Sequence, residues 1–439
     1  MLSVAAPPQP AYRAFHERNM HEIAQLRGVP EELLLAMRAV AAVLPFRTNA
    51  HVVDNLIDWS DVEHDPVYRL TFPAPGMLDR DDLARMVELL RENAPAPVVA
   101  AEAHEIRRRL NPHPGKQLAL NVPKADGWSL RGLQHKYHQT VLFFPSPRQT
   151  CHAYCTYCFR WAQFVGEPDL KMACNDSDVL RAYLQEHREV TDVLITGGDP
   201  MVMRADVLAR FIDPLLDPGF DSLRTIRIGT KSVAYWPYRF VSDPDADEIA
   251  RLFERVVRSG RQLAVMAHYS HPRELSPQVA REAVRRIRAT GACVYVQAPL
   301  IRGINDRSET WAELWRTALD LGMVPYYMFV ERDTGPRNYF EVPLVRAWRI
   351  FRDAYARISG LGRTVRGPVM SCTPGKVAID GVTEVAGREL LGLHYIQARD
   401  PDLVDRPFFA ELDVDATWFD QLVPAFEEQR MFFGTERRI

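Results

Sequence analysis

The stretch RQTCHAYCTYCFRW, residues 148–161, places Cys151, Cys155 and Cys158 on one short segment with gaps of three and two residues. It follows the apolar run VLFF at 141–144, which predicts a buried strand. Three thiolates on one loop can bind three irons of a cubane cluster and leave the fourth iron without a protein ligand. A structural zinc site would need a fourth protein ligand close by. The segment therefore indicates an iron–sulfur site at the end of a strand.

Further short apolar runs continue the pattern that VLFF begins, with amphipathic segments such as SPQVAREAVRRIRAT (276–290) between them. These runs are DVLITGG (192–198), IRIGT (226–230), LAVMAHY (263–269), CVYVQAPL (293–300) and PYYMFV (325–330). Repeated strand–helix units build a parallel sheet, and reactive groups gather on the loops at the carboxyl ends of its strands. The sequence therefore predicts an α/β fold.

The segments on either side of this pattern suggest three domains. Residues 1–110 carry helix-like runs such as EELLLAMRAVAAVL between proline-bearing turns, which predicts a helical N-terminal lobe. The strand–helix pattern belongs to residues 111–385. Residues 386–439 are acidic and aromatic without a repeat, so we expect an irregular C-terminal extension that packs on the central domain or on a partner subunit.

Charge and hydropathy exclude several classes of partner. Lys and Arg number 54 against 57 Asp and Glu, and the resulting net charge of −3 does not call for nucleic acid or an anionic membrane surface. No run approaches the roughly 20 apolar residues that cross a bilayer, and the first residues lack the pattern of a secretory signal. We expect a cytoplasmic protein. Six cysteines, half of them in one cluster, favour metal binding over disulfides.

A Gly-Gly-Asp turn, Gly197, Gly198 and Asp199, ends the predicted strand DVLI. Paired glycines let the backbone approach a ligand closely, and a carboxylate can accept a hydrogen bond from an ammonium group. An ordinary connection between strand and helix would look similar. The turn follows the cysteine loop by about one strand–helix unit, which favours a role in cofactor binding.

The cysteine spacing, with Tyr157 one residue before the last cysteine, resembles the signature of the radical S-adenosylmethionine (SAM) superfamily. Within that superfamily the chain is similar to the lysine 2,3-aminomutase family over roughly residues 40–385. The matching stretches, in order, are LPFRTNAHVVDNLIDW, DPVYRLTFP, LQHKYHQTVLFF, the cysteine loop, DVLITGGDP, IRIGTKS, AHYSHPREL, QAPLIRGIND, PYYMF and GPVMS.

The resemblance implies a partial (β/α)6 barrel that holds a [4Fe–4S] cluster on the three cysteines and cleaves SAM to a 5′-deoxyadenosyl radical. The Gly-Gly-Asp turn would bind the methionine amine of SAM, and Tyr157 would lie beside the cofactor. His268 and Gln297 end two predicted strands and would face it. His268 and His271 form a His-x2-His pair, but the family carries histidines here without a second metal.

Family members also hold pyridoxal phosphate on a lysine that follows a glycine-rich run. The matching place reads GLGRTVRGPVM (360–370), so Arg366 stands where that lysine is expected, and a guanidinium cannot replace the amine. The two phosphate-binding arginines of the family fall on Lys136 and Thr140. These departures weigh against pyridoxal phosphate. Lys376 is the nearest alternative lysine, with a plain turn residue as the competing interpretation.

Arg160 matches the family arginine that holds the substrate carboxylate, a surface salt bridge being the alternative. Lysine-specific members bind the distal ammonium group with two aspartates, and these positions read Arg332 and Ser359. A cation does not attract a cation, which disfavours free L-lysine. Arg332 and Arg366 suit a carboxylate, phosphate or other acceptor-rich group, and Asp333 belongs to the same predicted substrate-binding loop.

Cys372 follows GPVMS close to this predicted site. Its thiol could donate a hydrogen atom to a substrate radical, so it is our candidate catalytic residue. Cys174 and Cys293 are predicted to be small buried side chains. A zinc site built from C-terminal cysteines, found in aminomutases of this family, is not expected because no cysteine follows Cys372.

We therefore expect a radical SAM enzyme, an isomerase or a catalyst of another radical transformation, that abstracts hydrogen from an amino acid or related carboxylate. Its partners would be this small molecule and an electron donor such as flavodoxin or ferredoxin, and the resemblance suggests a homo-oligomer. Two alternatives stay open. One is a pyridoxal-phosphate-dependent 2,3-aminomutase with a relocated lysine, and the other is an iron–sulfur or zinc protein with a structural or sensing role.

Overall fold

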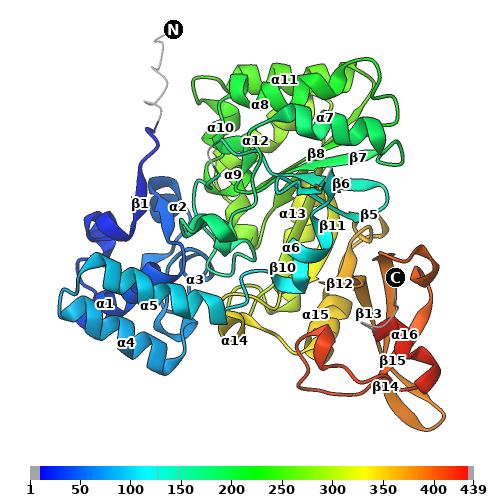
Figure 1. Ribbon diagram of the computed structural model, residues 1–439. Helices are drawn as coiled ribbons and strands as arrows, with labels where there is room; N and C mark the ends of the chain where they lie inside the picture. The colour runs from blue at the N-terminus through cyan, green and yellow to red at the C-terminus, as the bar shows by residue number, and fades with distance from the viewer. Residues whose placement is uncertain (1–9, 126, 148, 434–439) are drawn as a thin grey trace.

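An open sheet of eleven strands forms the centre of the computed structural model, which describes residues 10–125, 127–147 and 149–433 (Figure 1). Seven neighbouring strands run parallel, in chain order, from β6 to β12. They are β6 (Thr140–Phe143), β7 (Asp192–Ile195), β8 (Thr225–Thr230), β9 (Gln262–His268), β10 (Cys293–Leu300), β11 (Val324–Val330) and β12 (Arg366–Ser371). The apolar runs identified in the sequence form β6 to β11.

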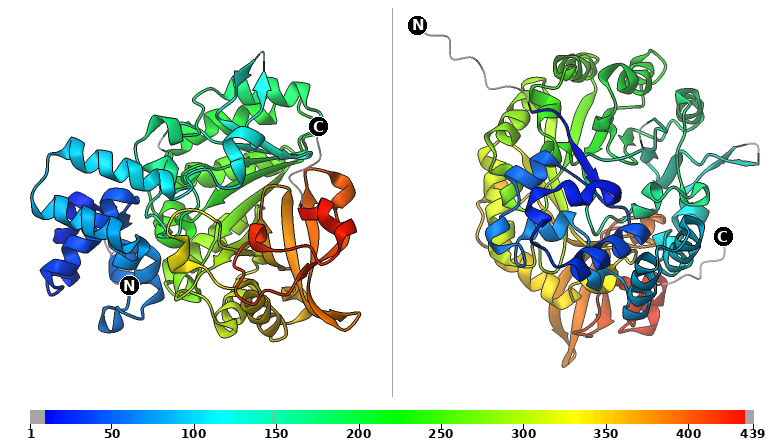
Figure 2. Two further views of the ribbon diagram at one scale, coloured as in Figure 1. Left: turned by 60° about the horizontal axis from the view of Figure 1, so that its bottom comes forward. Right: turned by 90° about the vertical axis from the view of Figure 1, so that its left-hand side faces the viewer.

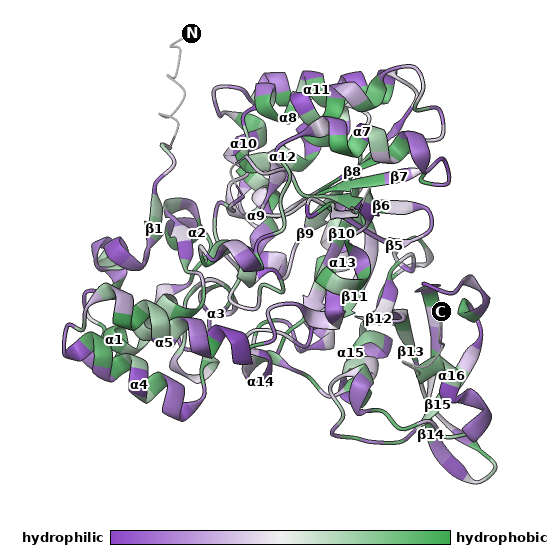
Figure 3. Cartoon of the chain, viewed as in Figure 1, coloured by the Kyte–Doolittle hydropathy of each residue, from purple (hydrophilic) through white to green (hydrophobic). Residues whose placement is uncertain are grey.

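Amphipathic helices pack outside the parallel strands and complete six strand–helix units (Figure 2). They are α7 (Ser177–Glu186), α8 (Ala205–Ile212), α11 (Ala246–Arg258), α12 (Gln278–Ala289), α13 (Ser308–Asp320) and α15 (Leu344–Tyr355). Each buries one apolar side, and hydrophobic and hydrophilic residues alternate along them in Figure 3. Short helices α9 (Ser232–Tyr235), α10 (Tyr238–Val241) and α14 (Arg337–Phe340) lie in the connections.

The sheet does not close into a complete barrel. At one edge β5 (Leu133–Tyr137) pairs antiparallel with β6, and at the other edge antiparallel strands continue from β12. In the described residues no pairing joins the two edge strands. The fold is therefore the partial barrel that the sequence comparison implied.

The C-terminal part is more regular than predicted. β13 (Gly375–Val385) and β14 (Arg388–Ala398) form a hairpin, so the predicted boundary at residue 385 falls in its turn, and β15 (Pro407–Glu411) extends the sheet further. Residues beyond β15 are irregular except for 3-10 turns and α16 (Arg430–Phe433). These strands enclose a second hydrophobic core around Tyr395, Phe408 and Phe419. Residues 434–439 of the predicted extension lie outside the described part.

The N-terminal lobe is helical, as predicted, and lies beside one end of the barrel (Figure 2). Its elements are β1 (Ala14–His16), α1 (Glu31–Val43), β2 (Arg47–Asn49), α2 (Ala50–Asn55), α3 (Pro66–Thr71), α4 (Arg80–Arg91) and α5 (Ala96–Arg109). α6 (Gln117–Asn121) and the short strands β3 (Lys124–Ala125) and β4 (Trp128–Ser129) lead from it to β5. Residues 1–9 of the predicted lobe lie outside the described part. Among the described helices none is long and apolar enough to cross a membrane.

Candidate functional site

The three cysteines of the motif lie together in the loop that leaves β6 at its carboxyl end. Burial raises the pKa of each thiol, to about 12 for Cys158, and the neighbouring thiolates raise the pKa values of Cys151 and Cys158 further. The three thiols therefore affect one another's ionisation. Bound metal cations would offset this effect, so the donor set fits a cluster that takes its ligands from this loop.

A mononuclear metal site fits these residues less well. In the part of the chain that the structure describes, no three histidine, cysteine or acidic side chains converge as a single ion requires. A cubane does not need this convergence, because each of three irons takes one thiolate and the irons themselves are spaced apart. The three thiols are therefore compatible with cluster binding, which the family resemblance implies.

The N-terminal lobe holds the cysteine loop in place. The Asn49 side chain is fully buried and donates to the carbonyl oxygen of His152 at 3.1 Å and to that of Tyr235 at 2.9 Å. Arg47 donates to Thr150 Oγ1 at 3.1 Å, and its carbonyl accepts from the Tyr154 amide at 2.8 Å. Sequence reasoning assigned no chemistry to this lobe, although the matching stretch LPFRTNAHVVDNLIDW contains Arg47 and Asn49.

The Gly-Gly-Asp turn packs directly on the cysteine loop. A Cβ atom added to Gly198 would lie 2.4 Å from the carbonyl oxygen and 2.5 Å from the amide nitrogen of Thr150, the residue before the first cysteine. The Asp199 amide donates to that same carbonyl at 2.8 Å. Gly197 has a φ of +138°, which L side chains rarely adopt. Both glycines are needed to bring this turn against the loop.

The Asp199 side chain does not have the role predicted for it. Its carboxylate is buried and accepts hydrogen bonds from Thr230 Oγ1, from the Lys231 and Ser232 amides and from Ser232 Oγ at 2.7–2.9 Å, and from the Met201 amide at 2.9 Å. A carboxylate with so many internal donors has no free lone pair for an ammonium ligand. Asp199 instead joins the turn after β7 to the turn after β8. The backbone carbonyls of the glycines remain the candidates for contact with SAM.

Tyr157 and His268 meet in a buried network behind the cysteines. The Tyr157 hydroxyl lies 2.9 Å from His268 Nε2 and 2.7 Å from Ser270 Oγ. Burial and the Lys231 ammonium hold the pKa of His268 well below its usual value, so the imidazole is neutral. Gln297 pairs with His268 in the register of β9 and β10. The structure therefore brings these three predicted cofactor residues to one side of the cysteine loop.

This network contains a buried ion pair that the sequence analysis did not predict. Lys231 Nζ lies 2.7 Å from Glu274 Oε1, and both side chains are less than a tenth exposed. Lys231 Nζ also lies 4.8 Å from the ring of Tyr235, whose hydroxyl is 3.3 Å from Cys155 Sγ. The positive charge of Lys231 lowers the pKa of Cys155 against the effect of burial. The signal was present, since Lys231 and Glu274 belong to the matching stretches IRIGTKS and AHYSHPREL.

Arg160 lies where a substrate could reach it. Its guanidinium donates to Thr196 Oγ1 at 2.8 Å and rests 4.7 Å from the ring centre of Phe144 and 5.1 Å from that of Phe159. No described carboxylate lies within ion-pair distance of it, and burial lowers its pKa to about 10. A partly buried arginine without an acidic partner suits an anionic ligand, as predicted for the substrate carboxylate.

Arg332 approaches the same place from the carboxyl end of β11. Its guanidinium lies 5.7 Å from the Phe159 ring and donates to the Pro114 carbonyl at 3.2 Å. Asp333 lies beside it. Asn111 donates to the Asp333 carboxylate at 3.3 Å and to its carbonyl at 2.6 Å, and the charge of Asp333 raises the pKa of Arg332 against the effect of burial. Of this predicted pair, Arg332 is the residue that rests against Phe159, the ring that also contacts Arg160.

Comparison with known proteins gives the family. No protein-family model matches the chain. A protein of Aquifex aeolicus (strain VF5), provisionally named L-lysine 2,3-aminomutase, is 30% identical over 405 residues, which cover 92% of this chain and 95% of the relative. The chain belongs to the L-lysine 2,3-aminomutase family. It is thus an enzyme of the radical SAM class.

Other matches cover less of each chain. The L-lysine 2,3-aminomutase of Escherichia coli (strain K12) is 27% identical over 52% of this chain and 63% of its own length, so the chain spans less than two thirds of that relative. Among solved structures, SuiB of Streptococcus suis bound to the precursor peptide SuiA aligns with a TM-score of 0.36 at 11% identity, covering 62% of this chain and 56% of SuiB. A radical SAM methyltransferase from Sphaerobacter thermophilus aligns with a TM-score of 0.32 at 15% identity, covering 65% of this chain and 92% of the methyltransferase.

Arg366 is not part of the site in this aminomutase-family chain. It is exposed and lies at the amino end of β12. The turns that surround the cysteines lie at the other edge of the sheet, at the carboxyl ends of the parallel strands. Its guanidinium stacks on Tyr326 and Tyr327 at 4.7 and 4.4 Å. The prediction that Arg366 binds substrate beside Arg332 is therefore wrong. Arg332 follows the carboxyl end of β11, whereas Arg366 lies at the amino end of the neighbouring parallel strand β12.

The Cys372 thiol is buried. It is 1% exposed, belongs to the C-terminal hydrophobic core and donates to the Gly375 carbonyl at 3.3 Å, and burial raises its pKa to about 11. The charge of the nearby Lys136 ammonium group acts in the opposite direction and lowers that pKa. The role of Cys372 as a hydrogen-atom donor stays a prediction.

The largest difference from the sequence prediction concerns Lys376. Its Nζ lies between two tyrosine rings, 5.3 Å from the ring centre of Tyr137 and 5.0 Å from that of Tyr327. It donates to Gln397 Oε1 at 2.7 Å. Burial, then the charges of Arg227 and Arg366, lower its pKa to about 7. Lys376 is therefore a buried amine and not the turn residue that the sequence favoured.

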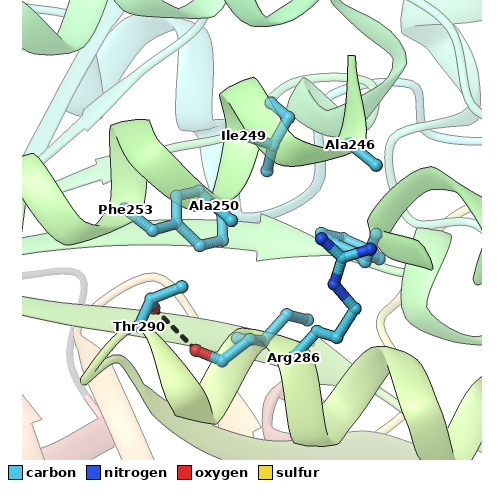
Figure 4. A pocket seen from close by; sticks show the side chains of 8 residues that line it. Ala246, Ile249, Ala250, Phe253, Arg286 and Thr290 are labelled. Carbon is cyan, nitrogen blue, oxygen red and sulfur yellow. Dashed lines mark hydrogen bonds between the residues drawn. The ribbon is translucent and has the colours of Figure 1, made fainter. Parts of the chain in front are cut away.

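A small apolar pocket on the helical layer is separate from this site. It lies among α10, α11 and α12 and is lined by Phe240, Ala246, Ile249, Ala250, Phe253, Arg286, Ile287 and Thr290 (Figure 4). Thr290 Oγ1 donates to the Ile287 carbonyl within it at 2.6 Å. None of these residues belongs to the cysteine loop or its neighbours, so the pocket has no part in the chemistry described above.

Proposed function

We propose that this chain binds a [4Fe–4S] cluster through Cys151, Cys155 and Cys158, cleaves SAM reductively and abstracts hydrogen from an amino acid or related carboxylate without pyridoxal phosphate. The observation that carries the proposal is the packing of the Gly-Gly turn and the N-terminal lobe around three clustered, buried thiols. A loop held from two sides is preorganised for a rigid cofactor.

When bound, the reduced cluster supplies the electron that converts SAM to methionine and a 5′-deoxyadenosyl radical, the species that takes a hydrogen atom from the substrate. The residues of the chain bind and orient around it. The carbonyls of Gly197 and Gly198 accept from the methionine ammonium group, and the neutral His268 offers a hydrogen-bonding face without adding charge. Arg160 binds the substrate carboxylate, and the buried Phe144 ring excludes water on one side of its guanidinium.

The test of this proposal is anaerobic reconstitution of the full chain, followed by iron and sulfide analysis and by measurement of 5′-deoxyadenosine after reduction with dithionite, flavodoxin or ferredoxin. We expect about four irons and four sulfides per chain and cleavage of SAM. Alanine at any of the three motif cysteines should remove both, whereas Cys293→Ala, which changes a cysteine at the start of β10, should keep both. Full cluster content after loss of a motif cysteine would contradict the assignment.

The second candidate is a pyridoxal-phosphate-dependent 2,3-aminomutase that uses Lys376. The observation in its favour is the buried amine with a pKa near 7, because a neutral lysine is the form that attacks an aldehyde. The family resemblance supplies the cofactor, and the tyrosine rings on either side of Lys376 would flank it.

Pyridoxal phosphate and borohydride decide between the two candidates. The protein is incubated with the cofactor at pH 8, reduced with borohydride and mapped by peptide mass spectrometry. The first candidate predicts no stoichiometric label. A label on Lys376 that is lost in Lys376→Met and kept in Lys171→Met would establish the second candidate in its place.

A further inference from the structure

Three cationic side chains from distant parts of the sequence converge on the segment between β12 and β13. Lys136 Nζ donates to the carbonyl of Cys372, and Arg399 Nε donates to the carbonyl of Thr373 at 2.9 Å. Arg332 lies near the same segment, with Gly115 next to both. A Cβ atom added to Gly115 would lie 3.1 Å from Arg332 Nη2 and 3.7 Å from Thr373 Oγ1. The three cations therefore surround one short piece of backbone.

These charges have no ion-pair partner. Among the described residues, no carboxylate lies within ion-pair distance of Lys136, Arg332 or Arg399, although the charge of Asp333 acts on Arg332. Their acceptors are carbonyl oxygens and the amide oxygen of Asn121. The Nε of Arg332 is buried with no acceptor at all. A buried donor without a partner is costly, so the site is built for an acceptor that the chain does not provide.

The electrostatics of Lys136 agree with this. Burial and the charges of Arg332, Arg399 and Lys376 lower its pKa to about 7, while the charge of Cys372 raises it. Mutual repulsion of this kind is relieved when an anion binds among the cations.

The cation site is continuous with Arg160. Arg332 and Arg160 rest against the same ring, Phe159, at 5.7 and 5.1 Å, and the charge of Arg332 lowers the pKa of Arg160. Phe159 itself is 37% exposed. Arg160 and the Lys136, Arg332 and Arg399 site are therefore neighbours across one ring that reaches solvent.

We infer that Lys136, Arg332 and Arg399 form a second anion site, and that the substrate is an amino acid with a second anionic group, a carboxylate or a phosphate monoester, on its side chain. The inference rests on the proposed function, because Arg160 is taken to bind the α-carboxylate. Two anion sites on one molecule would also disfavour a substrate with a distal ammonium group.

The experiment compares amino acids that differ only in the distal charge, with reconstituted full-length protein and SAM. Dissociation constants are measured by calorimetry for L-glutamate against L-glutamine, L-aspartate against L-asparagine and O-phospho-L-serine against L-serine, and 5′-deoxyadenosine formation is measured for each. A charged hydrogen bond is worth about tenfold to hundredfold in affinity, so we expect at least one acid to bind about tenfold or more tightly than its uncharged partner. The pair that shows the difference identifies the second group as carboxylate or phosphate.

Variants locate the effect. Arg332→Gln and Lys136→Met should each reduce the preference for the acid toward unity and leave iron content unchanged. Arg352→Gln, which alters an exposed arginine of α15, should keep the preference. Slow SAM cleavage without any amino acid reports on the proposed function separately, so its absence would refute that function and not the anion site. Equal affinity for acid and amide in every pair would overturn the inference, as would stoichiometric pyridoxal phosphate binding that Arg332→Gln abolishes, since the cations would then serve the cofactor phosphate.

Discussion

At the residue scale, neighbours decide what a side chain can do. Asp199 and Arg160 were both predicted to bind ligands, yet five groups of the chain itself donate to the Asp199 carboxylate, whereas Arg160 keeps donors that no described carboxylate takes. A buried polar group whose partners are supplied internally is structural, and one that lacks them is available to a ligand. This distinction depends on contacts between residues that are far apart in sequence.

Asp199→Ala should therefore destabilise the protein. It leaves buried donors of Thr230, Lys231 and Ser232 without their acceptor, and we expect a loss of about 3 kcal/mol in the free energy of unfolding. Urea denaturation at pH 7 measures the loss. Asp206→Ala, an exposed acid of α8, is the control and should change stability by less than about 0.5 kcal/mol. A similar effect of both changes would contradict the structural role of Asp199.

Lys376→Met should stabilise the protein at pH 7. The pKa of Lys376 falls from an ordinary 10.5 to about 7 on folding, so between these values the unfolded chain binds more protons than the folded chain. The free energy of unfolding of the wild-type chain therefore rises with pH between about 7 and 10.5. Near pH 7 the lysine is destabilising, because folding must remove its proton. We expect a gain of about 1–2 kcal/mol at pH 7 that shrinks toward pH 10. Thermal unfolding of both proteins at pH 7, 8.5 and 10 measures this, and a gain that does not depend on pH would disprove the charge explanation.

At the element scale, turns between strands and helices bring the site together. The cysteine loop follows β6, the Gly-Gly-Asp turn follows β7, Lys231 follows β8 and Ser270 follows β9. Parallel neighbours place all these turns at one edge of the sheet, so residues separated by over a hundred positions form hydrogen bonds there.

Gly198→Ala tests this arrangement. The new methyl group would lie 2.4–2.5 Å from backbone atoms of Thr150, and neither backbone can yield without moving the cysteine loop. We expect iron content after reconstitution to fall severalfold, while the far-UV circular dichroism spectrum stays unchanged. Gly28→Ala, where the added Cβ meets nothing within 4 Å, should reconstitute normally. Full iron content in Gly198→Ala would show that the turn does not determine the position of the loop.

At the scale of the whole molecule, segments from both ends of the chain pack onto the barrel. The N-terminal lobe binds the cysteine loop through Asn49, and the C-terminal strands extend the sheet beyond β12 and enclose their own core. Neither segment contains the motif that identifies the family. Both nevertheless contribute residues to the site, Arg47 from one and Arg399 from the other.

Truncation after Val385 should prevent folding to a soluble protein. It removes β14 and β15 and leaves one edge of β13 without a partner strand. It also removes Tyr395 and Phe408, so the apolar side chains that they cover in the C-terminal core, such as Val377 and Ile379, become exposed. We expect aggregation, measured by soluble yield and gel filtration. A point variant gives a finer test, because Phe408→Ala should cost about 3–5 kcal/mol whereas the 60%-exposed Val423→Ala should be neutral. A soluble, monodisperse truncated chain would support an independent extension instead.

The sequence by itself determined the parallel strands, the helices and the cysteine loop, because these depend on local periodicity and on spacing within one segment. It did not determine that Asp199 is saturated, that Arg366 lies at the far end of its strand from the site, that the Cys372 thiol belongs to the C-terminal core, or that Lys376 is a buried amine. Those properties depend on which strand end, and which face of a strand, a residue occupies, and on partners contributed by other turns. The tertiary structure alone therefore decided the second anion site. Lys136 belongs to β5 and Arg399 directly follows β14, strands near opposite edges of the sheet, and they approach Arg332 only because the sheet curves back on itself.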